Sequence, residues 1–245
     1  MKWFRILFIF IWRIWFYILV IVPIIILLPA LLITTSKEKW YKNTYKIGRF
    51  WAKIILFGMG FYPKVKYNAK LKKNESYMLT ANHTSMIDIM MMIYVSKNPF
   101  VFIGKEELAK LPVFGIVYRR SCILVDRKNP RSRKKAFEEA QRRLKNGTSI
   151  CIFPEGGVPR DITKKLDEFK DGAFRLSIEH QIPIVPISFP DSKTHFRYEF
   201  LTGKPGVLHA FVHPMIHTKG LELNLANRKM LKQKTAEVIS SKLTW

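Results

Sequence analysis

The sequence predicts an α/β fold, in which a central sheet, mostly parallel or mixed, is flanked by helices and preceded by an N-terminal hydrophobic helical membrane anchor. A long block near the N-terminus is apolar and carries no charge. Downstream, short apolar segments alternate with helix-like segments, which is the pattern of a layered sheet. The chain has 245 residues, enough for one substantial domain and an appendage.

The anchor is the first predicted element. Residues 14–36 carry no charged side chain, and a helix of this length reaches the roughly 30 Å of a bilayer core. A secretory signal peptide has a shorter apolar region and a small-residue cleavage site, whereas here Lys37 and Lys39 follow a long run. We therefore expect a retained membrane segment. Aromatic side chains that favour the headgroup level lie near its ends: Trp3, Trp12, Trp15, Tyr17 and Trp40.

The sequence leaves the mode of insertion open. Pro23 and Pro29 each lack a backbone donor and could bend or break the helix. A second apolar stretch, residues 54–62, is too short to cross a bilayer. A single span and two linked helices in one leaflet fit equally well. We expect residues 1–62 to anchor the chain and residues 63–245 to form the α/β domain.

The elements of that domain follow in order. A strongly charged helix over residues 131–145 ends at Asn146-Gly147, and shorter helices are expected over residues 87–95 and 173–180. Apolar runs of strand length lie between them. The predicted strands are residues 77–81, 101–103, 122–125, 149–153, 184–189 and 207–212.

Composition excludes two classes of protein and suggests a kind of partner. A hydrophobic content of 48% excludes a disordered chain, and two cysteines exclude a disulfide scaffold. The net charge of +24 predicts an anionic partner, which could be nucleic acid, a phosphorylated substrate or a membrane. Residues 37–73 hold eleven basic and one acidic side chain beside the anchor, and residues 119–145 hold eleven and three.

The first candidate site is the segment Asn-His-Thr-Ser-Met-Ile-Asp, residues 82–88, between a predicted strand and a predicted helix. If His83 lies in the turn and Asp88 in the first helical turn, the carboxylate can fix the tautomer of the ring. The other ring nitrogen can then take a proton from a hydroxyl. Alternatively, Ser85-x-x-Asp88 is a capping box, which would make Asp88 a helix cap.

Two further motifs also follow predicted strands. In Phe-Pro-Glu-Gly-Gly, residues 153–157, the adjacent Gly156 and Gly157 allow the backbone to approach a ligand, and Glu155 can accept hydrogen bonds from a hydroxyl. Asp126-Arg127 offers a guanidinium fork that matches phosphate oxygens. Each has an ordinary alternative, a Pro/Gly turn for the first and a surface charge for the second. The segment Ile-Pro-Ile-Val-Pro-Ile, residues 182–187, is interpreted as structural.

In this order the motifs resemble those of the glycerophospholipid acyltransferases, and more closely those of the bacterial 1-acylglycerol-3-phosphate (lysophosphatidic acid) acyltransferases. The resemblance runs over about residues 66–215. It implies that His83 is the catalytic base and Asp88 its orienting partner. It associates Arg127 with the phosphate of the acceptor and Glu155 with acceptor binding. We also expect Asn82, Lys105, Gly156 and Gly157 to bind substrate.

The resemblance also implies a reaction. A fatty acyl group would pass from acyl-CoA or acyl carrier protein to the free hydroxyl of 1-acylglycerol-3-phosphate, giving phosphatidic acid. It implies no metal, no cofactor and no covalent enzyme intermediate. With the larger basic cluster downstream of the anchor, the positive-inside rule places the domain at the cytoplasmic face of a bacterial inner membrane. The expected partners are the acyl donor, a lysophospholipid and the anionic membrane, rather than nucleic acid.

Departures from the family pattern leave the identity of the acceptor lipid undecided. The third motif usually continues Thr-Arg-Ser, and here it continues Gly157-Val158-Pro159, with Arg160 displaced by two positions. Ser121 stands where a glycine is expected. A lyso-aminolipid acceptor, such as a lyso-ornithine or lyso-glycine lipid, therefore remains an alternative.

Other functions are weighed against this one. A thioesterase would use the same His-Asp pair with water, and a non-catalytic basic protein would only bind anionic lipid or nucleic acid. Cys151 lies in an apolar strand and is interpreted as a buried structural thiol rather than a nucleophile. His209, His213 and His217 have metal-like spacing, but Pro214 prevents a regular helix, so we expect strand-end or surface histidines and no metal site.

Overall fold

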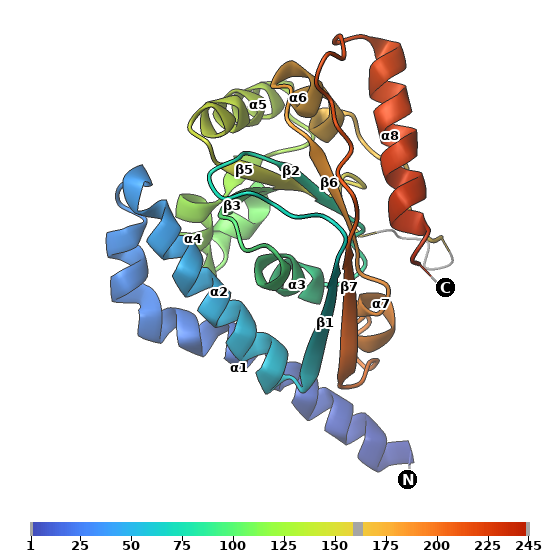
Figure 1. Cartoon of the computed structure of the whole chain (residues 1–245). Coiled ribbons are helices and arrows are strands. Elements are labelled where there is room, and N and C mark those ends of the chain that lie inside the picture. Colours follow the sequence, from blue (N-terminus) through green and yellow to red (C-terminus); the bar gives the residue numbers. More distant parts are fainter. Residues whose placement is uncertain (1, 159–163, 244–245) are drawn as a thin grey trace.

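A single mixed sheet forms the centre of the molecule. The computed structural model describes residues 2–158 and 164–243, and in these residues seven strands lie in the order β1-β7-β6-β2-β5-β3-β4. All neighbouring strands are parallel except β6 and β7, which are antiparallel. The predicted α/β fold is thus confirmed (Figure 1). The strands are β1 (Phe61–Tyr67), β2 (Met78–Ala81), β3 (Phe100–Lys105), β4 (Ile123–Val125), β5 (Ser149–Ile152), β6 (Ile184–Ser188) and β7 (Gly206–Val212).

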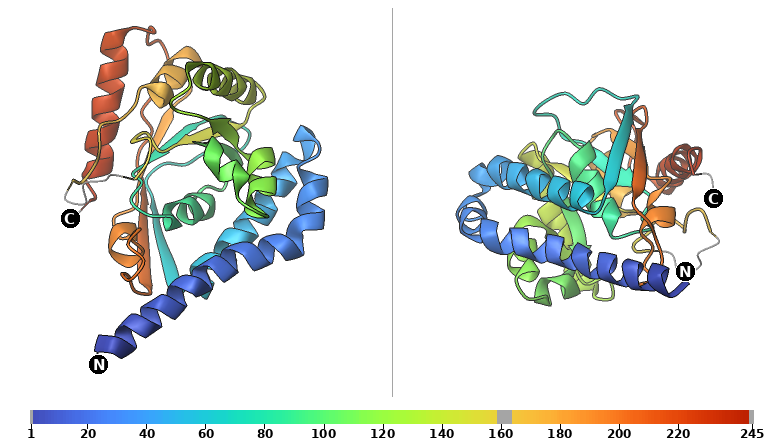
Figure 2. Two further views of the ribbon diagram at one scale, coloured as in Figure 1. Left: turned by 180° about the vertical axis from the view of Figure 1, so that it is seen from behind. Right: turned by 90° about the horizontal axis from the view of Figure 1, so that it is seen from below.

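Helices cover both faces of the sheet. One face carries α3 (Ile87–Val95) and a hairpin made of α1 (Lys2–Thr34) and α2 (Tyr41–Gly58), while the other carries α5 (Pro130–Lys145), α6 (Gly172–Glu179) and α8 (Leu225–Ser240) (Figures 1 and 2). The shorter helices are η1 (Glu38–Trp40), η2 (Glu106–Lys110), α4 (Phe114–Ser121) and α7 (Ser192–His195).

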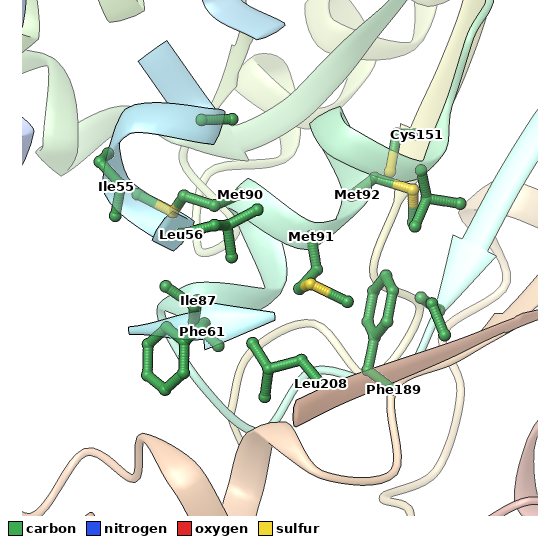
Figure 3. Close-up of a cluster of buried hydrophobic side chains, with 14 of the residues drawn as sticks. Ile55, Leu56, Phe61, Ile87, Met90, Met91, Met92, Cys151, Phe189 and Leu208 are labelled. Atoms are coloured by element: carbon green, nitrogen blue, oxygen red, sulfur yellow. The ribbon is translucent and has the colours of Figure 1, made fainter. Parts of the chain in front are cut away.

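Alternating side chains of the strands supply two cores. On β2, Met78 joins the core beneath α5, α6 and α8, whereas Leu79 joins the core beneath α3 and the hairpin. A strand that is buried on both faces consists of a continuous run of apolar residues, so these strands could be predicted from the sequence. Figure 3 shows the core around Met90, Met91 and Met92 of α3, with Cys151 at its edge.

Besides the short elements η1, η2 and α7, three elements were not predicted from the sequence: β1, α4 and α8. Strand β1 is an edge strand in which Lys64 and Lys66 are exposed, so its apolar signal is weak. It crosses the expected domain boundary at residues 62 and 63. Helix α4 is short, and α8 buries few side chains in a largely polar sequence, namely Leu231, Thr235 and Ile239.

The α1–α2 hairpin packs against the domain. Helix α1 continues through Pro23 and Pro29, although Figure 2 shows it changing direction along its length. The indole N–H groups of Trp12 and Trp51 join the two helices by donating to carbonyls across the hairpin, at 3.1 and 3.0 Å. Within the described residues, α1 is the one helix long and apolar enough to cross a membrane, and it could therefore serve as a membrane anchor.

Candidate active site

The turn between β2 and α3 brings His83 and Asp88 together. Strand β2 lies between β5 and β6 in the middle of the sheet, and the chain leaves it into residues 82–86 before α3 begins. One oxygen of Asp88, Oδ2, accepts the backbone N–H of Thr84 at 2.7 Å and that of Ser85 at 2.8 Å, and it lies 3.1 Å from Nδ1 of His83. Asp88 therefore caps the turn and orients the ring at the same time.

The ring of His83 is fixed on a second side by Phe153. The two rings are stacked, with their centroids 4.3 Å apart and their planes at 21°. The imidazole is 14% exposed, while Asp88 is fully buried. Because an ionised carboxylate can only accept a hydrogen bond, Nδ1 carries the proton and Nε2 is the basic nitrogen. This is the tautomer that a general base needs.

Glu155 and Asn82 hold the loops around His83. The two carboxylate oxygens of Glu155 accept the backbone N–H of His83 at 2.7 Å and that of Asp167 at 2.8 Å. The amide group of Asn82 pairs in both directions with the backbone of Phe189, at 2.8 and 3.0 Å. Both side chains are buried, and burial raises the pKa of Glu155 to about 7. In the described part of the chain, neither residue lines the cavity beside His83.

A cavity of about 510 Å³ opens beside the ring of His83. Its lining includes two cationic side chains, Lys105 of β3 and Arg127, and also Gly157. The rest of the wall is largely apolar and comes mainly from α1, α2, α3, β3 and α4. Its apolar side chains include Ile24, Leu27, Leu31, Ile89, Ile93, Phe102, Phe114 and Val117. The cavity can thus hold a long apolar chain that carries an anionic group.

Arg127 lies beside the two glycines of the third motif. A Cβ atom added to either Gly156 or Gly157 would lie 3.8 Å from Nη1 of Arg127. Gly156 also has a φ of +81°, which favours glycine, and its N–H donates to the carbonyl of Phe153 at 3.0 Å. The guanidinium therefore lies against the Gly156–Gly157 backbone, close to His83.

The remaining candidates from the sequence lie elsewhere. Cys151 is fully buried in β5, and burial raises the pKa of its thiol well above its usual value, which excludes it as a nucleophile. Two of the three histidines of the 209–217 run have separate partners: His209 pairs with Asp191, and His213 with the buried Ser188. Arg160 lies outside the described residues.

Sequence reasoning missed two residues that touch this site. Phe153, which stacks on His83, was noted only as part of a turn motif, although its place at the end of β5 could have indicated its position. Tyr198 lines the cavity together with His83 and Arg127. It follows α7, far along the chain, and no local motif marks it.

Comparison with known proteins identifies the family. The model of a family described as "Acyltransferase" matches residues 63–190, just over half of the chain. The chain belongs to this acyltransferase family. All eight residues expected to form the site of this acyltransferase fall within the matched range.

Individual acyltransferases match over similar lengths. A "Probable 1-acyl-sn-glycerol-3-phosphate acyltransferase" of Mycoplasma pneumoniae is 29% identical over 181 residues, covering 70% of this chain and 67% of that protein. A "1-acyl-sn-glycerol-3-phosphate acyltransferase" of Borreliella burgdorferi is 27% identical over 165 residues, covering 67% of this chain and 65% of its own length. The chain thus aligns with about two thirds of each of these relatives.

One solved structure shares the whole fold of this acyltransferase. The crystal structure of the 1-acyl-sn-glycerophosphate acyltransferase PlsC of Thermotoga maritima aligns with a TM-score of 0.79 and 24% identity, covering 100% of this chain and 99% of that one. The shared fold includes the α1–α2 hairpin as well as the sheet.

Proposed function

We propose that the enzyme transfers a fatty acyl group from a thioester donor, acyl-CoA or acyl carrier protein, to the free hydroxyl of 1-acylglycerol-3-phosphate, which gives phosphatidic acid. The observation that carries this proposal is the oriented His83–Asp88 pair beside a largely apolar cavity that two cations, Lys105 and Arg127, also line. The names of the relatives point to the same reaction.

The chemistry needs one base and one oriented hydroxyl. Nε2 of His83 takes the proton of the acceptor hydroxyl while that oxygen attacks the thioester carbonyl. The tetrahedral intermediate then expels the thiolate, which takes the proton back from the imidazolium. The carboxylate of Asp88 stabilises that imidazolium in the transition state. Because the N–H of Gly156 already donates to Phe153, the guanidinium of Arg127 is the better candidate to stabilise the developing oxyanion or the phosphate.

Two cations in the cavity wall support a phosphate-bearing acceptor. The customary arginine after Phe-Pro-Glu-Gly is missing from the sequence, but Arg127 lies against Gly156 and Gly157 in space. Lys105 lines the same cavity, and a guanidinium fork suits phosphate oxygens. These cations favour 1-acylglycerol-3-phosphate over a lyso-aminolipid, which lacks the phosphate group.

We further propose that the hairpin enters one leaflet, at the cytoplasmic face of the membrane. One side of α1 is buried against the rest of the protein from Ile9 to Leu31, so a transmembrane α1 would draw polar surface of the domain into the bilayer. Its other side exposes apolar side chains such as Ile18 and Ile25, and the basic segment 37–73 begins beside it. Such a cluster attracts anionic headgroups at about 1 kcal/mol per residue.

The mode of insertion can be tested by labelling. Cysteines introduced by Trp3→Cys and Lys37→Cys would react equally with an impermeant thiol reagent in sealed vesicles of one orientation if the hairpin stays in one leaflet. Protection of one cysteine and not the other would indicate a single span.

Activity can be tested with the purified protein in vesicles. We expect transfer of a labelled acyl group to 1-acylglycerol-3-phosphate in preference to other lyso-lipids, and loss of transfer in a folded His83→Ala variant. Free fatty acid as the main product would favour a thioesterase. Binding to anionic vesicles with no acyl chemistry would favour the non-catalytic alternative.

A further inference from the structure

The segment of residues 196–202, here called the bridging segment, joins the membrane helix α1 to the catalytic turn. On the α1 side it is held by Arg13, a charged side chain that is only 1% exposed. Nη2 of Arg13 donates to the carbonyls of Arg197, Glu199 and Thr202 at 2.7, 3.0 and 2.7 Å, and Nε donates to Thr202 at 3.2 Å. The guanidinium also lies 4.0 Å from the ring centroid of Phe196.

The glycine that follows the segment shows how closely it fits against α1. Gly203 has a φ of +110°, and a Cβ atom there would lie 2.5 Å from the carbonyl oxygen of His195 and 3.2 Å from the ring of Trp12. A buried guanidinium is costly unless its donors are satisfied. Nε and Nη2 of Arg13 find their acceptors in three carbonyls of one short segment, which fixes the course of that segment.

On its other side the bridging segment contacts the catalytic turn. The hydroxyl of Ser85 donates to the carbonyl of Phe196, while the backbone N–H of Ser85 donates to Asp88. A short path of hydrogen bonds and ring contacts therefore links Arg13 in α1 to the carboxylate that orients His83.

Side chains of the bridging segment reach both the cavity and α1. Tyr198, which is 50% exposed, lines the cavity with His83 and Arg127. Phe200 and Leu201 are also exposed, and the ring of Phe200 packs edge-on against Phe10 of α1, with a centroid distance of 5.8 Å. The segment thus lies between the cavity and the apolar surface of the proposed anchor, where an acceptor lipid would pass from the bilayer to His83.

We propose that the hydroxyl of Tyr198 donates a hydrogen bond to the anionic headgroup of the acceptor lipid, and that Arg13 is the positioning residue that holds Tyr198 there. This inference rests on the proposed function. Partial burial raises the pKa of Tyr198 to about 12, with the nearby Asp88 adding to the effect, so the phenol keeps its proton. It supplies a donor in the cavity that Arg127 and Lys105 also line, at a site whose third motif lacks the customary arginine.

The first test separates acceptor binding from folding. In Tyr198→Phe, which removes one oxygen atom, we expect KM for 1-acylglycerol-3-phosphate to rise about tenfold, while KM for the acyl donor and kcat change less than twofold. Tyr62→Phe removes the same atom from an exposed tyrosine on β1 and should change neither constant. An unchanged KM for the acceptor in Tyr198→Phe would overturn the proposal.

The second test asks whether Arg13 acts through Tyr198. Arg13→Lys keeps the charge but loses the fork, and we expect it to raise the acceptor KM in the wild-type background and much less in the Tyr198→Phe background. Arg5→Lys, on an exposed site of the same helix, is the control. Equal effects in both backgrounds would overturn the positioning role, and Arg13→Gln repeats the cycle if the lysine variant does not fold. A wild-type enzyme that acylates no lyso-lipid would instead overturn the proposed function.

Discussion

Two His–Asp pairs occur in the described residues of this molecule, and one of them, His83–Asp88, lies beside the cavity of about 510 Å³. His83 Nδ1 is 3.1 Å from Asp88 Oδ2 at the end of β2, and His209 Nδ1 is 2.8 Å from Asp191 Oδ2 at the side of β7. In both pairs the carboxylate also accepts backbone N–H groups. The shorter distance belongs to the exposed pair, whose side chains are 46% and 28% exposed, against 14% and 0% for the other.

The difference shows that surroundings, rather than the distance between ring and carboxylate, mark a catalytic pair. Water screens the charge of Asp191, so its effect on His209 is weak. Asp88 is buried away from water, and its charge acts on an imidazole whose position is also fixed by stacking on Phe153. The buried pair faces a space that can hold a substrate.

The largest expected effect comes from removing each imidazole in turn. His83→Ala should lower kcat by about 10²–10⁴-fold, because general base catalysis contributes that much. His209→Ala should leave kcat within a factor of two, since it removes an exposed side chain away from the cavity. Acyl transfer by both variants, with circular dichroism to check folding, measures the difference. Similar losses of kcat in the two variants would show that the His83–Asp88 pair has no special catalytic role.

The next effect comes from replacing each carboxylate by an amide. Asp88→Asn should lower kcat by at least about 100-fold, because an amide can present its NH₂ group to the ring and so favour the wrong tautomer. Asp191→Asn loses an exposed ion pair and should cost less than about 1 kcal/mol in stability, with no change in kcat. Steady-state kinetics and thermal unfolding of both variants provide the measurement. Full activity of Asp88→Asn would contradict the orienting role.

Sequence motifs predicted the catalytic pair but not what surrounds it. The spacing of His83 and Asp88 is local, so a strand, a turn and the start of a helix are enough to bring them together. The two roles weighed for Asp88, cap and orienting partner, turned out to be compatible, because one oxygen accepts from the ring and from two backbone N–H groups. Asn82 and Glu155 were expected to bind substrate, and their hydrogen bonds within the protein instead favour a positioning role, which stays a prediction.

Elements that depend on long-range contacts could not be predicted. Strand β1 pairs with β7, which lies far along the chain. The exposed lysines of β1 interrupt its apolar residues, so the sequence does not show a clear strand pattern. Tyr198 lines the cavity from a segment whose backbone carbonyls accept hydrogen bonds from Arg13, and nothing near either residue in the sequence indicates that contact. The buried central strands could be predicted because a continuous apolar run indicates a strand that is buried on both faces.

A third prediction extends the comparison to the cations at the cavity. Arg127→Ala should raise KM for 1-acylglycerol-3-phosphate by about 10–100-fold, since a charge-assisted hydrogen bond contributes about 1.5–3 kcal/mol. Arg120→Ala, on the exposed side of α4, removes the same charge and should have little effect on KM. Competition between phosphate-bearing and phosphate-free lyso-lipids measures the loss. Equal losses for both kinds of acceptor would show that Arg127 acts on the acyl donor or the oxyanion instead.

The last prediction concerns stability rather than activity and tests the buried carboxylate of Glu155. Its pKa is raised to about 7 in the folded protein, so between about pH 4.5 and 7 the folded state binds more protons than the unfolded state. Stability therefore falls as pH rises through this window. Glu155→Gln cannot titrate, and the wild type should lose about 2.5 kcal/mol of unfolding free energy relative to it between pH 5 and 8. Chemical unfolding at several pH values measures this slope, with the exposed Glu138→Gln as control. If the unfolding free energies of the wild type and Glu155→Gln change with pH in the same way, Glu155 stays ionised throughout and is stabilised by the backbone N–H groups of His83 and Asp167.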